Sequence, residues 1–274
     1  NVTNACFDPR ELVAHYPRGE KELLGPFHKF QPGDTMEWFA DRGVELKIEP
    51  DNRVFPVTDS SATIADCLKE IADATGIKVH KSSGVKSFTQ REDERWEVLT
   101  TQGQTHVADR LMIGAGSSKA IWDTLKKLGH KIIPPVPSLF TFNSKDERIK
   151  GLSGISVPNA TVQVAASDLE ASGPLLITHW GFSGPAILRL SAWGARELND
   201  RFYRFPIMIN WIGRDEDEVL ADFNEEKKHS GKKRIGNHAH YGIPLRLWKS
   251  MVAGAGIKST ATWGDLSGKD LKHL

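Results

Sequence analysis

Three prolines within four residues are the strongest constraint on how this chain folds. Pro134, Pro135 and Pro137 form the segment Pro-Pro-Val-Pro. Because proline fixes φ and lacks an amide donor, such a segment enters neither a helix nor a central strand. A chain of 274 residues is long enough for two domains of ordinary size. The sequence therefore predicts one domain over residues 1–133 and a second over residues 134–274.

Residues 1–133 alternate between helical and strand patterns, which is typical of an α/β domain. Asp34 is expected to open the third helix with a capping box. From residue 77 to 113 the apolar period changes to two, which predicts a β-meander, starting at Ile77 and Val79, that feeds a buried strand at Leu111-Met112-Ile113. The predicted helices cover 8–16, 23–30, 34–43, 60–76 and 116–129, and the other predicted strands cover 44–48 and 53–56.

Residues 134–274 divide into two parts of different character. Residues 134–213 are mainly β, with one helix predicted at 184–195 after Gly184-Pro185. Residues 214–274 are charge-dense and mainly helical, with helices predicted near 215–228, 244–253 and 267–273. The strand-like segments of the first part are 138–142, 155–166, 174–179 and 202–212.

Charge, cysteine and hydropathy exclude several classes of protein. Lys and Arg number 36 and Asp and Glu 35, so no overall field attracts nucleic acid or an anionic membrane, and neither is an expected partner. Cys6 and Cys67 are too few for a disulfide framework or a zinc motif. No run approaches the roughly 18 apolar residues of a membrane helix. These features predict a cytoplasmic protein, and the sequence leaves its oligomeric state open.

The segment Leu111 to Lys119 combines a strand, a glycine turn and a helix start, which is how phosphate is held on backbone amides. The G-x-G-x-x-G fingerprint fails because Lys119 stands where its third glycine belongs. No acidic residue follows at the distance that would hold a ribose hydroxyl, and P-loop spacing is absent. Without further information, a plain turn that joins a strand to a helix is favoured.

The stretch Thr178 to Pro185, THWGFSGP, is the most unusual in the chain. A nucleophile elbow would read G-x-S-x-G, and here Pro185 occupies the last glycine position. Ser183 is therefore expected to cap the following helix, and a serine hydrolase that uses Ser183 is kept as an alternative. His179 is interpreted either as a catalytic group or as a partly buried packing histidine.

Two other clusters carry weaker signals. His238 and His240 lie two residues apart, but no third ligand stands at a known spacing, so no metal site is predicted. The basic run over 227–234 could touch phosphates, but an acidic run over 215–226 precedes it. A solvated helix and loop is the favoured interpretation of that pair of runs.

Three stretches together resemble the HI0933-like flavoprotein family, which includes aminoacetone-oxidase-like members. They are NVTNA at 1–5, GVELKIEPDNRVFPVTDSSATIADCL at 43–68 and LLITHWGFSGPAIL at 175–188. The T-H-x-G-x-S-G-P element in the third stretch is the most specific. The three occur in the family's order and extend over nearly the whole chain.

The resemblance implies an α/β fold, with a partial FAD/NAD(P)-binding Rossmann-like domain at 1–133. The insert domain at 134–274 would combine a β-barrel-like part and a small helical part. It also implies an FAD-dependent oxidoreductase acting on a small organic substrate, an amine or an enone-like compound, with NAD(P)H as a possible electron donor. His179 and Ser183 are then the catalytic candidates. The expected cofactor-binding residues are Asn1, Val2, Thr3, Asn4, Gly114, Ala115 and Gly116.

The family's G-x-G-x-x-G unit and its C-terminal flavin segment are both absent from these 274 residues. The chain opens with Asn1, and we treat it as a fragment of a longer protein. We expect the fragment alone to be inactive and to bind FAD weakly or not at all. The alternative from another class is a non-catalytic module, in which the insert domain binds a partner or acts as a lid.

Overall fold

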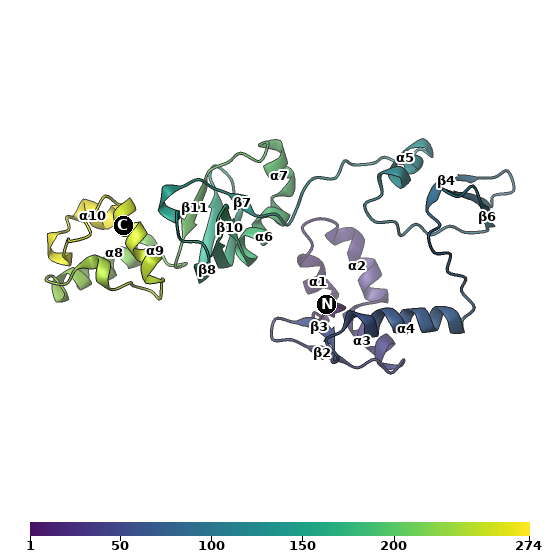
Figure 1. Ribbon diagram of the computed structural model, residues 1–274, viewed down its shortest axis with the longest axis horizontal. Helices are drawn as coiled ribbons and strands as arrows, with labels where there is room; N and C mark the ends of the chain where they lie inside the picture. Colours follow the sequence, from purple (N-terminus) through teal and green to yellow (C-terminus); the bar gives the residue numbers. More distant parts are fainter. The chain divides into compact units, whose positions relative to one another are not determined.

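The computed structural model describes residues 1–274, and these divide into two compact units, Asn1–Pro134 and Pro135–Leu274. The division lies inside the proline segment. Each unit is described by itself. Unit 1 runs from purple to blue-green in Figure 1, and unit 2 continues in green to yellow.

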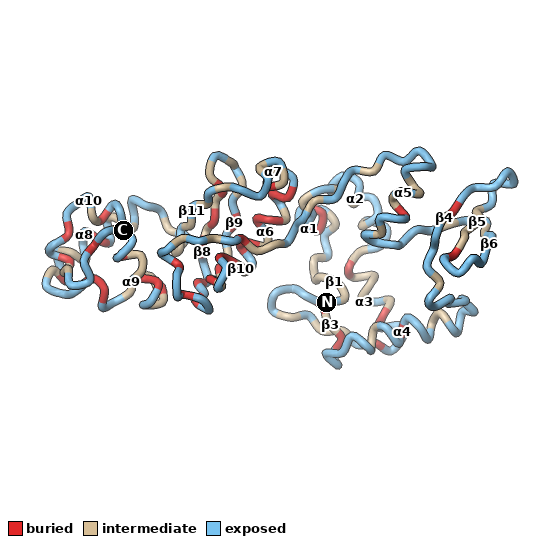
Figure 2. Tube along the Cα trace, turned by 45° about the horizontal axis from the view of Figure 1, so that its top comes forward, coloured by how far each residue is buried: buried red, intermediate tan, exposed pale blue.

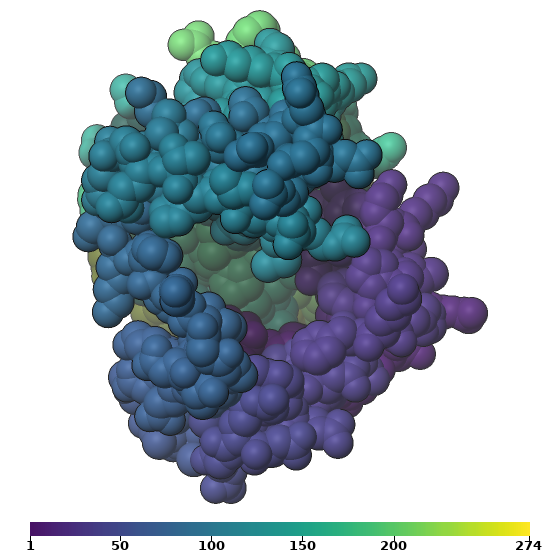
Figure 3. Space-filling model, turned by 90° about the vertical axis from the view of Figure 1, so that its right-hand side faces the viewer, coloured from purple at the N-terminus to yellow at the C-terminus, as the bar shows by residue number.

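The first half of unit 1 packs helices around a small antiparallel sheet. Strand β1 pairs with β3, and β3 pairs with β2, so β3 is central. The atoms of this half are coloured from purple to blue in Figure 3. Its elements are β1 (Thr3–Asn4), α1 (Pro9–Ala14), α2 (Glu20–Lys29), α3 (Pro32–Ala40), β2 (Leu46–Ile48), β3 (Arg53–Pro56) and α4 (Ser61–Ala74).

Local capping explains where these helices begin. Asp8 accepts hydrogen bonds from two amides at the start of α1, and Ser60 accepts one from the Ala62 amide at the start of α4, so the helices predicted from residues 8 and 60 begin where expected. The predicted start at Asp34 is wrong. The N-cap of α3 is Gln31, and Asp34 is the third helical residue, whose carboxylate accepts the Gln31 amide at 2.7 Å. The capping box is present, but it begins at Gln31, three residues before the predicted start, because Pro32 takes the first helical position.

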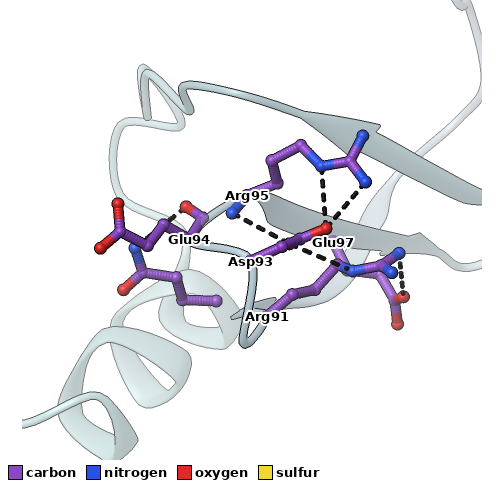
Figure 4. A network of polar contacts seen from close by, with 6 residues as sticks. Arg91, Asp93, Glu94, Arg95 and Glu97 are labelled. Carbon is purple, nitrogen blue, oxygen red and sulfur yellow. Dashed lines mark hydrogen bonds and ion pairs between the residues drawn. The ribbon is translucent and has the colours of Figure 1, made fainter.

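The second half of unit 1 is a three-stranded meander with one helix. The order β4-β5-β6 is antiparallel throughout. Charged side chains close the β4–β5 turn, where Asp93 accepts from Arg95 at 2.7 Å and lies 3.5 Å from Arg91 (Figure 4). The elements are β4 (Val85–Gln90), β5 (Trp96–Thr100), β6 (Thr105–Ala108) and α5 (Lys119–Lys127).

The buried strand predicted at Leu111–Ile113 does not form. The segment has no regular structure, and Met112 is 94% exposed. Ile77 and Val79 also lie outside any strand and are exposed. A buried strand of this kind needs paired neighbours on both edges, and no strand pair of unit 1 is parallel. The Rossmann-like character of residues 1–133 therefore stays a prediction.

Unit 2 begins with an open five-stranded sheet, ordered β11-β8-β9-β10-β7 and antiparallel at every pairing. Its edges are β7 and β11. Mixed α/β structure is thus confirmed, and the predicted β-barrel-like part is a half-barrel sheet. The elements are β7 (Phe142–Asn143), η1 (Glu147–Ile149), β8 (Ser156–Val164), β9 (Glu170–Ile177), β10 (Gly181–Ser183), α6 (Pro185–Trp193), α7 (Ala195–Asp200) and β11 (Ile207–Asn210).

A single apolar core stabilises unit 2. Helix α6 packs on β8, β9 and β10, and its inward residues Ala186, Ile187 and Leu190 are almost fully buried. Figure 2 shows buried residues concentrated in this unit, in the half-barrel and in the helices after it. Burying apolar side chains at about 25 cal/mol per Å² makes this the main source of stability.

A helical part completes unit 2. Its helices surround Phe223, Trp248 and Trp263, which are buried against one another. Trp248 also donates its indole N–H to the Ile235 carbonyl oxygen at 2.8 Å. The elements are α8 (Glu216–His229), η2 (Ile235–Asn237), α9 (Leu245–Gly254), η3 (Trp263–Asp265) and α10 (Gly268–His273). No helix in the chain combines the length and apolar character that a bilayer crossing requires.

Candidate functional site

The β9–β10 hairpin of unit 2 carries the two predicted catalytic residues. At its turn the Thr178 amide donates to the Gly181 carbonyl oxygen at 2.8 Å, and His179 and Trp180 form the tip. Both tip side chains are exposed, and their rings lie edge to face with centroids 4.0 Å apart. The structure thus presents an imidazole to solvent, where a substrate can reach it.

The strands beneath the tip are rigidly held. Ile177 and Phe182 pair across the hairpin and are buried in the core. On the other side, the Ser144 amide donates to the Trp180 carbonyl oxygen at 2.9 Å, which links the tip to the segment after β7. Groups held on packed strands keep a reactive side chain in place better than a free loop does.

Two glycines make this geometry possible. Gly181 has φ +149°, and a Cβ there would lie 2.1 Å from the Phe142 carbonyl oxygen. Gly184 has φ +99°, and its Cβ would lie 2.7 Å from the Pro174 carbonyl oxygen. The glycines of the T-H-x-G-x-S-G-P element are therefore required because neighbouring backbone passes too close for any side chain.

Thr178 adds an unexpected polar group to the hairpin. Its hydroxyl oxygen is buried and has no hydrogen-bond partner. An unsatisfied buried hydroxyl costs about 1–3 kcal/mol, and such groups concentrate where a ligand or a water completes the bonding. The hydroxyl lies next in sequence to His179, so the hairpin offers an imidazole and an unused hydroxyl together.

Ser183 does not behave as predicted from its sequence context. It lies in β10 opposite Leu176, and the N-cap of α6 is Gly184, with no side-chain cap bond. The expected cap fails because Gly184 adopts a conformation that keeps Ser183 in the strand. No hydrogen bond joins the Ser183 hydroxyl to His179, whereas a serine nucleophile needs an adjacent base. The geometry gives the hydrolase alternative no support.

The residues predicted to bind the cofactor lie in unit 1, in two separate segments. Thr3 and Asn4 form β1 against Val54 and Arg53, and Asn1 and Val2 lead into it. Gly114, Ala115 and Gly116 lie in an exposed irregular segment before α5.

Those two segments share no hydrogen bond. Space is open around both glycines, and nothing lies within 4 Å of a Cβ placed on Gly114 or Gly116. The glycine turn therefore leaves room for a ligand, but the residues present do not by themselves form a flavin site.

A cavity of about 940 Å³ lies in unit 2, and residues of both edge strands of the sheet, β7 and β11, line it. Phe142 of β7 and Met208 near the other edge both line it, as does Met251 of α9. Its polar side includes Asp146 and Arg148, which are paired at 2.7 Å. Arg148 lowers the pKa of the Asp146 carboxyl, so this carboxylate stays ionised. The volume of the cavity is typical of a pocket that binds a small molecule.

His238 and His240 do not form a metal site with other side chains. No group of three or more His, Cys, Asp or Glu is arranged to hold a metal ion. His240 packs instead against Trp248 and Trp263, with ring centroids 5.3 and 5.1 Å away. Burial lowers the pKa of His240, so it is neutral in the folded protein.

Sequence analysis missed Thr178 and Trp180 as members of the site. Trp180 occupies the variable position of the motif, so the motif itself gave no signal. The unpaired hydroxyl of Thr178 depends on tertiary packing, which no sequence pattern reports. An exposed tryptophan between a strand and a glycine would have been the one available hint.

A family model and curated relatives match this chain. A family model described as "HI0933-like protein barrel and H2TH domain" matches residues 136–274. A ribosomal RNA dihydrouridine synthase of Haemophilus influenzae is 27% identical over 203 residues, covering 70% of this chain and 49% of the relative. A ribosomal RNA dihydrouridine synthase of Escherichia coli is 25% identical over 260 residues, covering 90% and 60%. The chain thus spans about half to three-fifths of the length of these relatives.

Proposed function

Because the chain belongs to the HI0933-like family, as its motifs predicted, we propose that the complete protein is an FAD-dependent oxidoreductase. We further propose that it reduces an enone-like double bond and that a reduced nicotinamide is its electron donor. In such enzymes the flavin supplies the redox chemistry, and the protein supplies position, charge and exclusion of water. The chain described here contributes the hairpin tip and part of the cofactor-binding domain.

We propose uridine in ribosomal RNA as the substrate. The two relatives carry the name of enzymes that form dihydrouridine in ribosomal RNA. The C5=C6 bond of uracil is conjugated with the C4 carbonyl group, so it belongs to the enone-like class expected from the sequence. The net charge of the whole chain predicted that no nucleic acid is a partner. An RNA substrate departs from that expectation.

The proposal rests on the tip of the β9–β10 hairpin. Reduction of a conjugated double bond adds a hydride and a proton, and a positioned imidazole is a common proton donor. His179 is exposed, lies against Trp180 and is held by buried strands. We assign it the role of proton donor.

The test uses the protein expressed from its complete reading frame, with a ribosomal RNA transcript and a reductant. We expect dihydrouridine in the RNA, detected by mass spectrometry as the gain of two hydrogens. His179→Asn should lower kcat by about 10²–10⁴-fold, the usual contribution of a general acid. His229→Asn, which changes an exposed histidine on α8, serves as the matched control and should leave kcat unchanged.

Several outcomes would contradict the proposal. Full activity in His179→Asn would remove the assigned proton donor. Oxidation of an amine in place of uridine reduction would move the enzyme to the other expected substrate class. A colourless complete protein without activity would favour the non-catalytic module, and loss of activity in Ser183→Ala with hydrolysis of an ester would revive the hydrolase.

A further inference from the structure

The helical part of unit 2 separates its charges along the sequence. Residues 215–226 contain seven Asp or Glu and no Lys or Arg, whereas residues 227–274 contain ten Lys or Arg and two Asp or Glu. Sequence analysis favoured a solvated helix and loop because the two runs could neutralise each other.

The carboxylates of the acidic run form ion pairs mainly with Arg214, which lies outside the basic run. Arg214, which precedes the run, lies 2.7 Å from Asp222 and 3.3 Å from Glu218. Only one pair joins the two runs, Lys228 with Glu225 at 2.5 Å, apart from a weaker contact of 3.9 Å between Glu225 and His229. The cations beyond Lys228 therefore keep their charge uncompensated by α8.

Four of these cations lie on neighbouring stretches of backbone, which we call the basic ribbon: Lys232, Lys233, Arg234 and Lys258. Arg234 forms an antiparallel bridge with Thr262, and the Lys233 carbonyl oxygen accepts the Trp263 amide at 3.0 Å. Lys258 begins the turn that returns the chain to this bridge, because its carbonyl oxygen accepts the Ala261 amide at 2.9 Å.

No carboxylate neutralises the basic ribbon. All four side chains are exposed, and none forms an ion pair. The one acidic residue of the bridged segment, Asp265, is occupied, because the Thr262 amide and hydroxyl both donate to its carboxylate at 2.8 Å. Exposed cations on adjoining stretches of backbone, without counter-charges, favour binding of a polyanion.

We propose that the basic ribbon is a surface that contacts the phosphate groups of RNA. The proposal rests on the proposed function, since a substrate that is part of ribosomal RNA needs docking contacts beyond the reacting base. Phosphate contacts fix the position of a nucleic acid and carry no sequence information. The ribbon would therefore hold the RNA near the protein while other residues select the uridine.

The aromatic side chains nearby favour phosphate contact over base stacking. Trp263 and Trp248 are buried in the core of the helical part, so they present no face to a base. Proteins that stack bases expose aromatic rings among their cations. The ribbon lacks them, and its binding should be electrostatic and strongly dependent on salt.

The test measures the affinity of the full 274-residue chain for a fluorescent single-stranded RNA by anisotropy, at several salt concentrations. The variant combines Lys232→Gln, Lys233→Gln, Arg234→Gln and Lys258→Gln. We expect a loss of affinity of roughly tenfold or more, equal for different RNA sequences. The slope of log affinity against log salt should become less steep by about 3, which is roughly 0.7 for each of the four cations removed.

The matched control neutralises four exposed cations elsewhere in unit 2, namely Lys145, Lys150, Arg189 and Arg204. Its affinity for RNA should stay close to that of the unchanged chain. Thermal unfolding should be the same for all three proteins, since every altered side chain is exposed. An equal loss of RNA affinity in the control would contradict the proposed role of the ribbon. The same would follow if the chain bound polyglutamate as well as RNA, or if the fourfold variant bound RNA as well as the unchanged chain.

A second arm separates this proposal from the proposed function. In the complete protein, the fourfold variant should raise KM for RNA and leave kcat nearly unchanged, because the ribbon binds substrate equally in the ground and transition states. Unchanged KM with normal dihydrouridine formation would refute the ribbon and leave the enzyme activity intact. RNA binding through the ribbon without dihydrouridine formation would refute the activity alone.

Discussion

Gly181 has no room for a side chain, and this makes it the most sensitive position of the hairpin. Gly181→Ala would add a Cβ 2.1 Å from the Phe142 carbonyl oxygen and would keep φ in a strained region. We expect the free energy of unfolding to fall by about 2–5 kcal/mol, from overpacking together with backbone strain. Denaturant titration of the chain would measure the change.

Gly242→Ala is the control for strain alone. Gly242 has φ +72°, and nothing lies within 4 Å of a Cβ built there. The substitution should therefore cost only about 1–2 kcal/mol. If the two variants were equally stable, the close approach of β7 to the hairpin would be absent in solution.

Among the elements, α8, α9 and η3 are joined by an aromatic cluster that contains the titratable ring of His240. Its pKa is lowered by burial, against the raising effect of Glu226 and Asp222 and with a smaller lowering effect of His238. A group whose pKa is lower in the folded state is protonated first in the unfolded state. Stability is therefore full above pH 6.5, the ordinary value, and falls as the pH drops below it.

This pH dependence is checked by unfolding the chain at several pH values between 7.5 and 5. His240→Phe should reduce the loss of stability on acidification, since phenylalanine fits an aromatic cluster and carries no proton. His229→Gln alters an exposed histidine and should leave the loss as it is. An identical pH profile for His240→Phe would show that another group is responsible.

Elements set by local chemistry were predicted well, and those that depend on distant partners were not. Asp8 and Ser60 begin their helices as expected, because a cap needs only the next three residues. Leu111 to Ile113 has the composition of a buried strand, yet nothing in the chain pairs with it. For the same reason, Ser183 and His179 could be placed between a strand and a helix, but neither their hairpin nor their contacts could be assigned.

At the scale of the whole molecule, the two units differ in how much apolar surface they bury. Unit 2 has 27 buried apolar residues, whereas unit 1 has eight and exposes 14 large ones (Figure 2). The proline boundary and the family motifs could be predicted from the sequence. The incomplete packing of unit 1 could not, because composition does not say which apolar faces find partners.

The separation of the predicted cofactor segments leads to a prediction for the whole chain. Asn1–Asn4 and Gly114–Gly116 share no hydrogen bond, so the 274 residues should not retain FAD. After incubation with FAD and gel filtration, the chain should show no flavin absorption in the visible range. The protein from the complete reading frame should be yellow under the same conditions. A yellow 274-residue chain would mean that these segments suffice.

The opposed charge runs of the helical part have a further consequence. A body with one acidic and one basic end has a large electric dipole moment even when its net charge is small. The field of an approaching polyanion would exert a torque on it, turning the basic ribbon forward and α8 away before contact. Orientation would then be set during approach, and association would slow as added salt shortens the reach of that torque.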